Sequence, residues 1–169
     1  YSSGYSIVSC ILFGVMFYEL GNIRMVALAA IVAASLLPFF LHNVFGKHSK
    51  MFIGDAGTLS LGIIFSVFVI TILSANQNIE VAQDNLGLIP FTLAVLCVPV
   101  FDTLRVMSAR IARGKSPFSP DKTHLHHLFI ELGYSHIGTT MSIIGINLFV
   151  VFCWFLAYKW GLSIDMQLY

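Results

Sequence analysis

Long stretches without charge are the feature that most limits how this chain can fold. Five segments of 16 to 18 residues are almost entirely apolar, and Glu19 is the one charged residue within them. A helix of about 20 apolar residues crosses the hydrocarbon core of a bilayer with its backbone polar groups paired. We therefore predict an all-α membrane protein that forms a single membrane domain over residues 1–169. The five predicted transmembrane helices cover residues 5–20, 25–41, 59–75, 86–101 and 141–158.

Composition agrees with a membrane location. Hydrophobic residues make up 57% of the chain and charged residues 10%, and the mean hydropathy is +0.87. A soluble domain has about 25% charged residues. The net charge of +1 indicates no nucleic-acid partner. Cys10, Cys97 and Cys153 match neither a disulfide framework nor zinc-ligand spacing, so we interpret them as small buried apolar residues.

Most of the charged residues and all six histidines gather in two segments, which we call the first polar segment (residues 42–57) and the second polar segment (residues 102–139). Two predicted spans separate them, so both should lie on the same side of the membrane. Seven of the nine Lys and Arg residues fall in these two segments. Because basic residues are enriched in cytoplasmic loops, this side is predicted to be cytoplasmic.

Asp55 is the candidate metal ligand of the first polar segment. It lies between Gly54 and Gly57, just before a predicted helix, where unpaired N–H groups favour anions. Mg²⁺ is typically held by one or two carboxylates together with substrate phosphates. The alternative is that Asp55 simply caps the helix. Phe52 is either a core residue or a stacking surface for a base, and Asn43 is a plausible amide partner for the loop.

The second polar segment combines cations with three closely spaced histidines. We expect a helical extension over 104–112 that ends at Gly114, and a short helix whose apolar residues are Leu125, Leu128, Phe129 and Leu132 and which ends at Gly133. The histidines, His124, His126 and His127, fit no usual zinc pattern. They could bind phosphate, act as acid or base, or be ordinary surface residues.

The basic residues and Asp102 of the second polar segment each admit two interpretations. The five cations could cradle a pyrophosphate or lipid phosphate, or contact anionic lipid headgroups; they are Arg105, Arg110, Arg113, Lys115 and Lys122. Asp102 could cap or pair with Arg105, or face a catalytic cavity.

Three motifs together resemble one family, the polyprenyl-phosphate N-acetylhexosamine-1-phosphate transferases. Residues 52–58 are similar to its F-M-G-D-A/T-G-S/T motif, and residues 99–105 to its P-x-x-D-T-x-R motif. Residues 113–127 resemble its longer and more specific R-G-x-S-P-F-x-x-D-x-x-H-I/L-H-H motif. The last match indicates the branch that transfers N-acetylglucosamine-1-phosphate, or a related sugar phosphate, to undecaprenyl phosphate.

The resemblance implies a Mg²⁺-dependent enzyme, with Mn²⁺ as a substitute, in the bacterial inner membrane. It would take a UDP-sugar and undecaprenyl phosphate and release UMP, as the first step of a cell-envelope polysaccharide such as lipopolysaccharide. A homodimer is left open. The resemblance covers the C-terminal half of a family pattern with ten or eleven spans, so further acidic residues of the site are expected outside this chain.

By the same resemblance, Asp55 would bind the metal, Phe52 would stack on uracil, and Asn43 and Gly54 would contact the nucleotide. The remaining site residues would be Asp102, Arg105, Arg113, Lys115, His124, His126 and His127, around the phosphates. The alternative function is a non-catalytic helix bundle: a transporter subunit, an assembly partner or a truncated remnant. Charges at span boundaries favour chemistry on a lipid headgroup, because a transporter more often buries a charge within a span.

Overall fold

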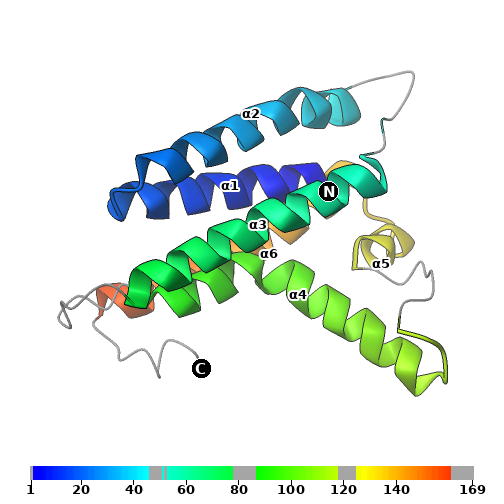
Figure 1. Ribbon diagram of the computed structural model, residues 1–169. Coiled ribbons are helices and arrows are strands. Elements are labelled where there is room, and N and C mark those ends of the chain that lie inside the picture. Colours follow the sequence, from blue (N-terminus) through cyan, green and yellow to red (C-terminus); the bar gives the residue numbers. More distant parts are fainter. Residues whose placement is uncertain (1, 46–50, 52, 78–86, 118–124, 161–169) are drawn as a thin grey trace.

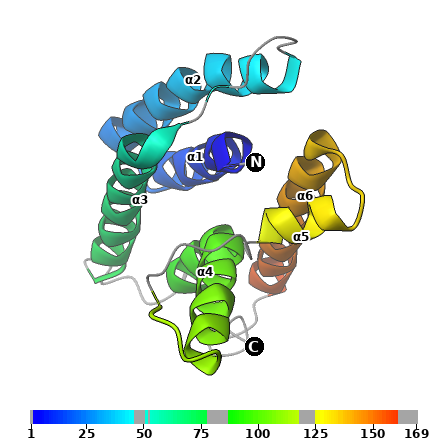
Figure 2. The same cartoon turned by 90° about the vertical axis from the view of Figure 1, so that its right-hand side faces the viewer.

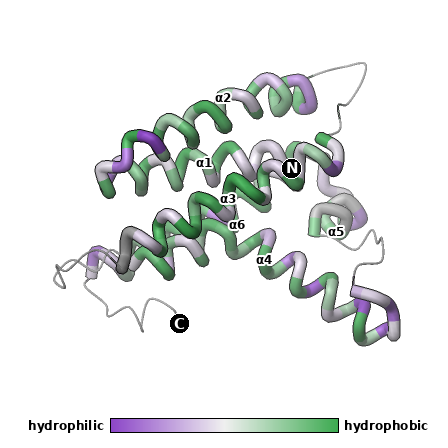
Figure 3. Tube along the Cα trace, in the orientation of Figure 1, coloured by the Kyte–Doolittle hydropathy of each residue, from purple (hydrophilic) through white to green (hydrophobic). Residues whose placement is uncertain are grey.

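A computed structural model describes residues 2–45, 51, 53–77, 87–117 and 125–160, and these ranges contain helices and turns but no strand. The helices are α1 (Ser2–Glu19), α2 (Ile23–Phe45), α3 (Gly54–Gln77), α4 (Leu88–Ala112), α5 (Leu125–Glu131) and α6 (His136–Lys159). The predicted all-α membrane fold is confirmed. Figure 3 shows the most hydrophilic residues near helix ends and along the outer part of α4, as expected for a bundle in a bilayer.

Helix α1 lies at the centre of the bundle. It forms an antiparallel hairpin with α2 and also contacts α3, α4 and α6, as Figures 1 and 2 show. Aromatic rings form much of the surrounding core: Phe13 lies 5.5 Å from Phe68 and 5.7 Å from Phe91, between ring centroids. Such offset and edge contacts favour tight helix packing.

Four of the described helices are long and apolar enough to cross a membrane, and they correspond to four of the five predicted spans. The predicted first span is α1, which is not among them. Its 18 residues bury Ser3, Ser6 and Ser9 against the other helices. These small polar residues lower its hydropathy, but they allow close helix packing.

The helices extend beyond the predicted spans at the polar end. Helix α3 begins at Gly54 rather than at 59, and α6 begins at His136 rather than at 141. The predicted span 86–101 and the extension 104–112 form the single helix α4. Gly114 has φ 68°, and the Lys115 N–H donates to the Arg110 carbonyl at 3.0 Å, which confirms the predicted end of this extension.

Helix α4 bends midway, and its C-terminal half leaves the bundle (Figure 1). Pro99 lies within the helix and has no N–H to donate to the carbonyl of Val95, four residues earlier. That carbonyl instead accepts from the Tyr5 hydroxyl and from Asn147 Nδ2, the latter at 3.1 Å. Residues of α1 and α6 therefore satisfy the backbone group that the proline leaves unpaired.

Candidate functional site

The described parts of the two polar segments lie at the same end of the bundle. In Figure 1 the end of α2, the start of α3, α5 and the start of α6 all lie on the right, and the α1–α2 turn lies at the opposite end. The two antiparallel spans between the segments produce this arrangement. The shared side predicted from the sequence is therefore found.

Asp55 is exposed in the first turn of α3. The preceding Gly54 has φ 71°, a conformation that other residues adopt at a cost of about 1 kcal/mol. A Cβ atom at Gly57 would lie 2.8 Å from Cγ2 of Ile53, so only glycine fits there without movement. Both glycines therefore shape the entry to α3. Because Asp55 follows the first residue of α3, it is an acidic residue of the first turn rather than the N-cap.

Asn43 fastens the segment before α3 to the end of α2. Its Nδ2 donates to the Met51 carbonyl at 3.0 Å, and the Met51 N–H donates to Asn43 Oδ1 at 2.8 Å. This is the amide contact with the loop that the sequence indicated. Phe52, the predicted stacking residue, lies outside the described residues.

Asp102 is buried near the bend of α4, with 5% of the residue exposed. Its Oδ1 accepts from Arg105 Nη2 at 3.0 Å and from the backbone N–H of Leu125 at 2.9 Å. The first interpretation given above, that Asp102 caps a helix or pairs with Arg105, is therefore observed in both of its forms. Sequence reasoning did not identify Leu125 as the partner, and no local pattern could have revealed it.

Helix α5, which contains the backbone of two of the three histidines, is docked on the bundle. The backbone of His126 and His127 lies in α5, whereas His124 lies outside the described residues. Leu125 and Phe129 pack on a small cluster formed by Tyr5, Val98 and Ile143. The predicted apolar stripe is thus confirmed at these two positions.

Two further predictions for α5 have different outcomes. Leu132 does not belong to the apolar stripe, because it is 75% exposed just after the helix ends. Gly133, with φ 88°, closes the helix as predicted: the Tyr134 N–H donates to the Phe129 carbonyl at 3.1 Å.

The basic residues lie along the part of α4 that leaves the bundle and just after it. Arg110 donates to the Pro117 carbonyl at 2.5 Å, while Arg113 and Lys115 are exposed beyond it. In both Figures 1 and 2 the tip of α4 lies apart from the start of α3. The structure therefore does not bring Arg113 and Lys115 beside Asp55.

The described residues form no group of three or more potential metal ligands of the His, Cys, Asp or Glu type. In Figure 2 the start of α3 and α5 lie on different sides of α1. The start of α3 and α5 thus face the same end of the bundle from different sides of α1.

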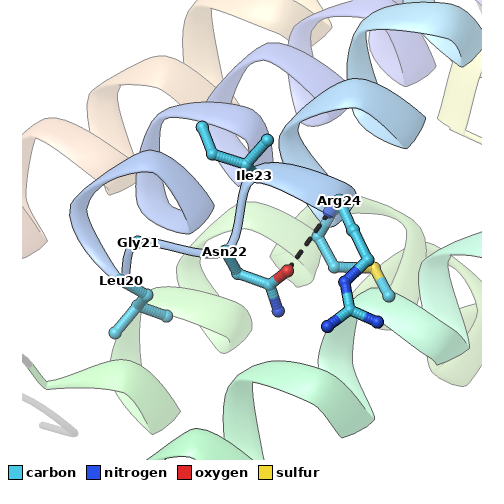
Figure 4. A pocket seen from close by; sticks show the side chains of 6 residues that line it. Leu20, Gly21, Asn22, Ile23 and Arg24 are labelled. Atoms are coloured by element: carbon cyan, nitrogen blue, oxygen red, sulfur yellow. Dashed lines mark hydrogen bonds between the residues drawn. The ribbon is translucent and has the colours of Figure 1, made fainter.

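The surface has a pocket far from the polar end of the bundle and a groove that leads toward it. The pocket, of about 680 Å³, surrounds the α1–α2 turn, where Asn22 Oδ1 accepts from the Met25 N–H at 3.4 Å (Figure 4). It lies at the end opposite the polar segments. The other, of about 630 Å³, is a groove between α3 and α4 whose lining includes Phe65, Val69 and Leu104. We call it the α3–α4 groove.

These features define a polytopic helical membrane protein whose polar end carries an exposed carboxylate and a histidine-bearing helix. Comparisons with known proteins identify its family. Residues 1–73 match the family described as glycosyl transferase family 4. Similarity to curated relatives extends over most of the chain. The chain belongs to this family, as its motifs indicated.

The relatives are transferases acting on polyprenyl phosphates, by their names. A decaprenyl-phosphate N-acetylglucosaminephosphotransferase of Mycolicibacterium smegmatis is 37% identical over 69% of this chain and 29% of the relative. An undecaprenyl-phosphate alpha-N-acetylglucosaminyl 1-phosphate transferase of Yersinia pestis is 31% identical over 76% of the chain and 34% of the relative.

A probable undecaprenyl-phosphate N-acetylglucosaminyl 1-phosphate transferase of Bacillus subtilis is 31% identical over 84% of the chain and 37% of the relative. The chain thus spans about a third of the length of these relatives. No solved structure matches it.

Proposed function

We propose that this chain forms part of an enzyme that transfers N-acetylglucosamine-1-phosphate, or a related N-acetylhexosamine-1-phosphate, from a UDP-sugar to undecaprenyl phosphate. The observation that carries the proposal is the exposed Asp55 carboxylate in the first turn of α3, at the same end of the bundle as the histidine helix α5. The names of the relatives support the reaction class. Relatives in bacteria and the apolar helices support a multi-pass protein of the bacterial inner membrane, with this end cytoplasmic.

The proposed reaction is a phosphoryl transfer. An oxygen of undecaprenyl phosphate attacks the β-phosphorus of the UDP-sugar, and the bond from that phosphorus to the bridging oxygen breaks. UMP leaves with the bridging oxygen, so one P–O bond forms as one breaks. Because both substrates are anions, the site must offset their repulsion before they can react.

Charge at the polar end can supply this offset. The exposed Asp55 carboxylate fits a Mg²⁺ ligand, and a bound Mg²⁺ or Mn²⁺ would neutralise phosphate oxygens. The free N–H groups at the start of α3 favour an anion. We assign phosphate contacts to Arg105 and to the histidines of the α5 segment, and longer-range attraction of both anions to Arg113 and Lys115.

The lipid tail of the acceptor requires an apolar path beside the polar end. The α3–α4 groove offers one: it is lined by apolar side chains of both helices and reaches Thr103 and Leu104, next to Asp102 and Arg105. A chain lying there would keep its isoprenoid units in the membrane and its phosphate at the polar end. Phe52 and Asn43 are assigned to the nucleotide, with Asn43 also holding the loop through Met51.

The test is Asp55→Asn in the full-length protein, measured as UMP release from UDP-N-acetylglucosamine with undecaprenyl phosphate and Mg²⁺. We expect a loss of about 100-fold or more in kcat, because a metal ligand becomes a weaker neutral one. Glu19→Gln is the matched control. Glu19 is an exposed carboxylate at the C-terminal end of α1, which lies at the end of the bundle away from Asp55. Near wild-type release by Asp55→Asn would remove the metal role, and no release by the wild-type protein would favour a non-catalytic bundle.

A further inference from the structure

Asp102 connects two parts of the chain that are 23 residues apart. Its side chain is 4% exposed, and one of its oxygens accepts both the Arg105 guanidinium, at 3.0 Å, and the Leu125 N–H, at 2.9 Å. Hydrogen bonds to a charged carboxylate are shorter and stronger than neutral ones. Asp102 therefore holds one particular point of the α5 backbone against α4.

That point is the middle of the histidine motif. The N–H of Leu125 belongs to the peptide that joins His124 to Leu125, and His126 follows directly. It is also among the first N–H groups of α5, which have no partner within the helix. Fixing this peptide limits the rotation of the backbone from which the neighbouring histidines project.

Apolar packing holds α5 without fixing this rotation as closely. Leu125 and Phe129 lie on the cluster of Tyr5, Val98 and Ile143. Such contacts are not directional, and α5 has only two turns, so small rotations would preserve most of the burial. The carboxylate adds the directional contact.

We propose that Asp102 is a positioning residue for the histidine motif and is not itself catalytic. This inference rests on the proposed transferase function. A general base or metal ligand must reach the substrate or the metal, but the Asp102 carboxylate is buried and bound to two donors. Its negative charge strengthens the contact with Leu125, whereas the geometry requires only an acceptor oxygen.

The test compares Asp102→Asn with Asp102→Leu in the full-length protein. Asparagine keeps an acceptor for the Leu125 N–H, and leucine has a similar volume but no acceptor. We expect Asp102→Asn to keep kcat within about tenfold and Asp102→Leu to lower it by about 100-fold, since a displacement of about 1 Å can cost that much. The KM for the UDP-sugar should change much less in both. Glu131→Gln, an exposed change of the same charge in α5, is the control.

Hydrogen exchange in nanodiscs gives a second readout that does not depend on activity. Asp102→Leu should speed exchange of the Leu125 amide by about tenfold, and Asp102→Asn should change it much less. Equal loss of kcat in both variants, with the amide still protected in Asp102→Asn, would show that the charge itself is required and would overturn the inference. Unchanged exchange in Asp102→Leu would also overturn it. Absent UMP release in the wild-type protein would instead refute the transferase function, and the exchange comparison would still decide the contact.

Discussion

Replacing Asn147 by leucine should loosen the contact between α6 and the bend of α4. Asn147 is fully buried, and its Nδ2 donates to the carbonyls of Ala94 and Val95, each at 3.1 Å. Pro99 leaves the Val95 carbonyl without its helical donor, and the Tyr5 hydroxyl is its other partner. Leucine fills nearly the same space but donates nothing, so the variant isolates the hydrogen bonds from the packing.

The magnitude follows from the two backbone hydrogen bonds that leucine cannot make, because the third contact, from Nδ2 to Cys97 Sγ at 3.6 Å, is to a weak acceptor. Hydrogen bonds between membrane helices contribute about 0.6 kcal/mol on average and up to about 1.7 kcal/mol. Removing both therefore costs about 1–2 kcal/mol. Among the described residues, Asn147 Oδ1 is buried and has no hydrogen-bond partner, so removing it returns part of this cost. We expect the free energy of unfolding to fall by about 1 kcal/mol, a factor of about five in the equilibrium constant.

Reversible unfolding of the full-length protein in bicelles, by steric trapping or denaturant, measures this change. A second background tests its cause. Pro99→Ala restores an N–H that can reach the Val95 carbonyl, so Asn147→Leu should cost clearly less in that background. If the two costs are equal within about 0.3 kcal/mol, Asn147 does not act by satisfying the carbonyl freed by proline, and the reasoning is wrong.

Two further predictions concern the entry to α3. Gly57→Ala should lower UMP release in the full-length protein, because the new Cβ atom would lie 2.8 Å from Ile53 Cγ2. Adding Ile53→Ala removes that methyl group and should restore UMP release. If it does not, this clash is not the cause of the loss. Asn43→Ala should lower kcat/KM by about tenfold, because it removes both hydrogen bonds between Asn43 and Met51. The Met51 amide hydrogen should also exchange faster with solvent. Unchanged exchange would show that Asn43 does not hold the segment before α3.

The sequence predicted the helices because uncharged length and hydropathy are local properties. Chain order then placed the two polar segments at one end, and this agrees with the structure. The ends at Gly114 and Gly133 were also predictable, since only a residue that tolerates positive φ closes a helix in this way. The motifs indicated the family, which the comparisons confirm.

Other sequence predictions were not settled, or were wrong, where packing or binding decides the outcome. The predicted segment 5–20 forms helix α1, but whether α1 crosses the membrane stays a prediction, because its serines lower its hydropathy below that of the four candidate spans. Leu132 has the spacing of an apolar stripe, yet it lies beyond the end of α5 and is exposed. The assignments of Asp55, Phe52 and the histidines to metal, nucleotide and phosphate stay predictions, because they concern molecules that bind to the site.

The amino-acid sequence alone specifies the class of fold, the placement of both polar segments at one end of the bundle, and the family. The packing of the helices was needed to show that Asp102 binds the N–H of Leu125, 23 residues away, and that Tyr5 and Asn147 meet at the Val95 carbonyl from 90 and 52 residues away. No periodicity or motif encodes such contacts. They depend on the angle at which whole helices pack, which the summed contacts of many side chains set together.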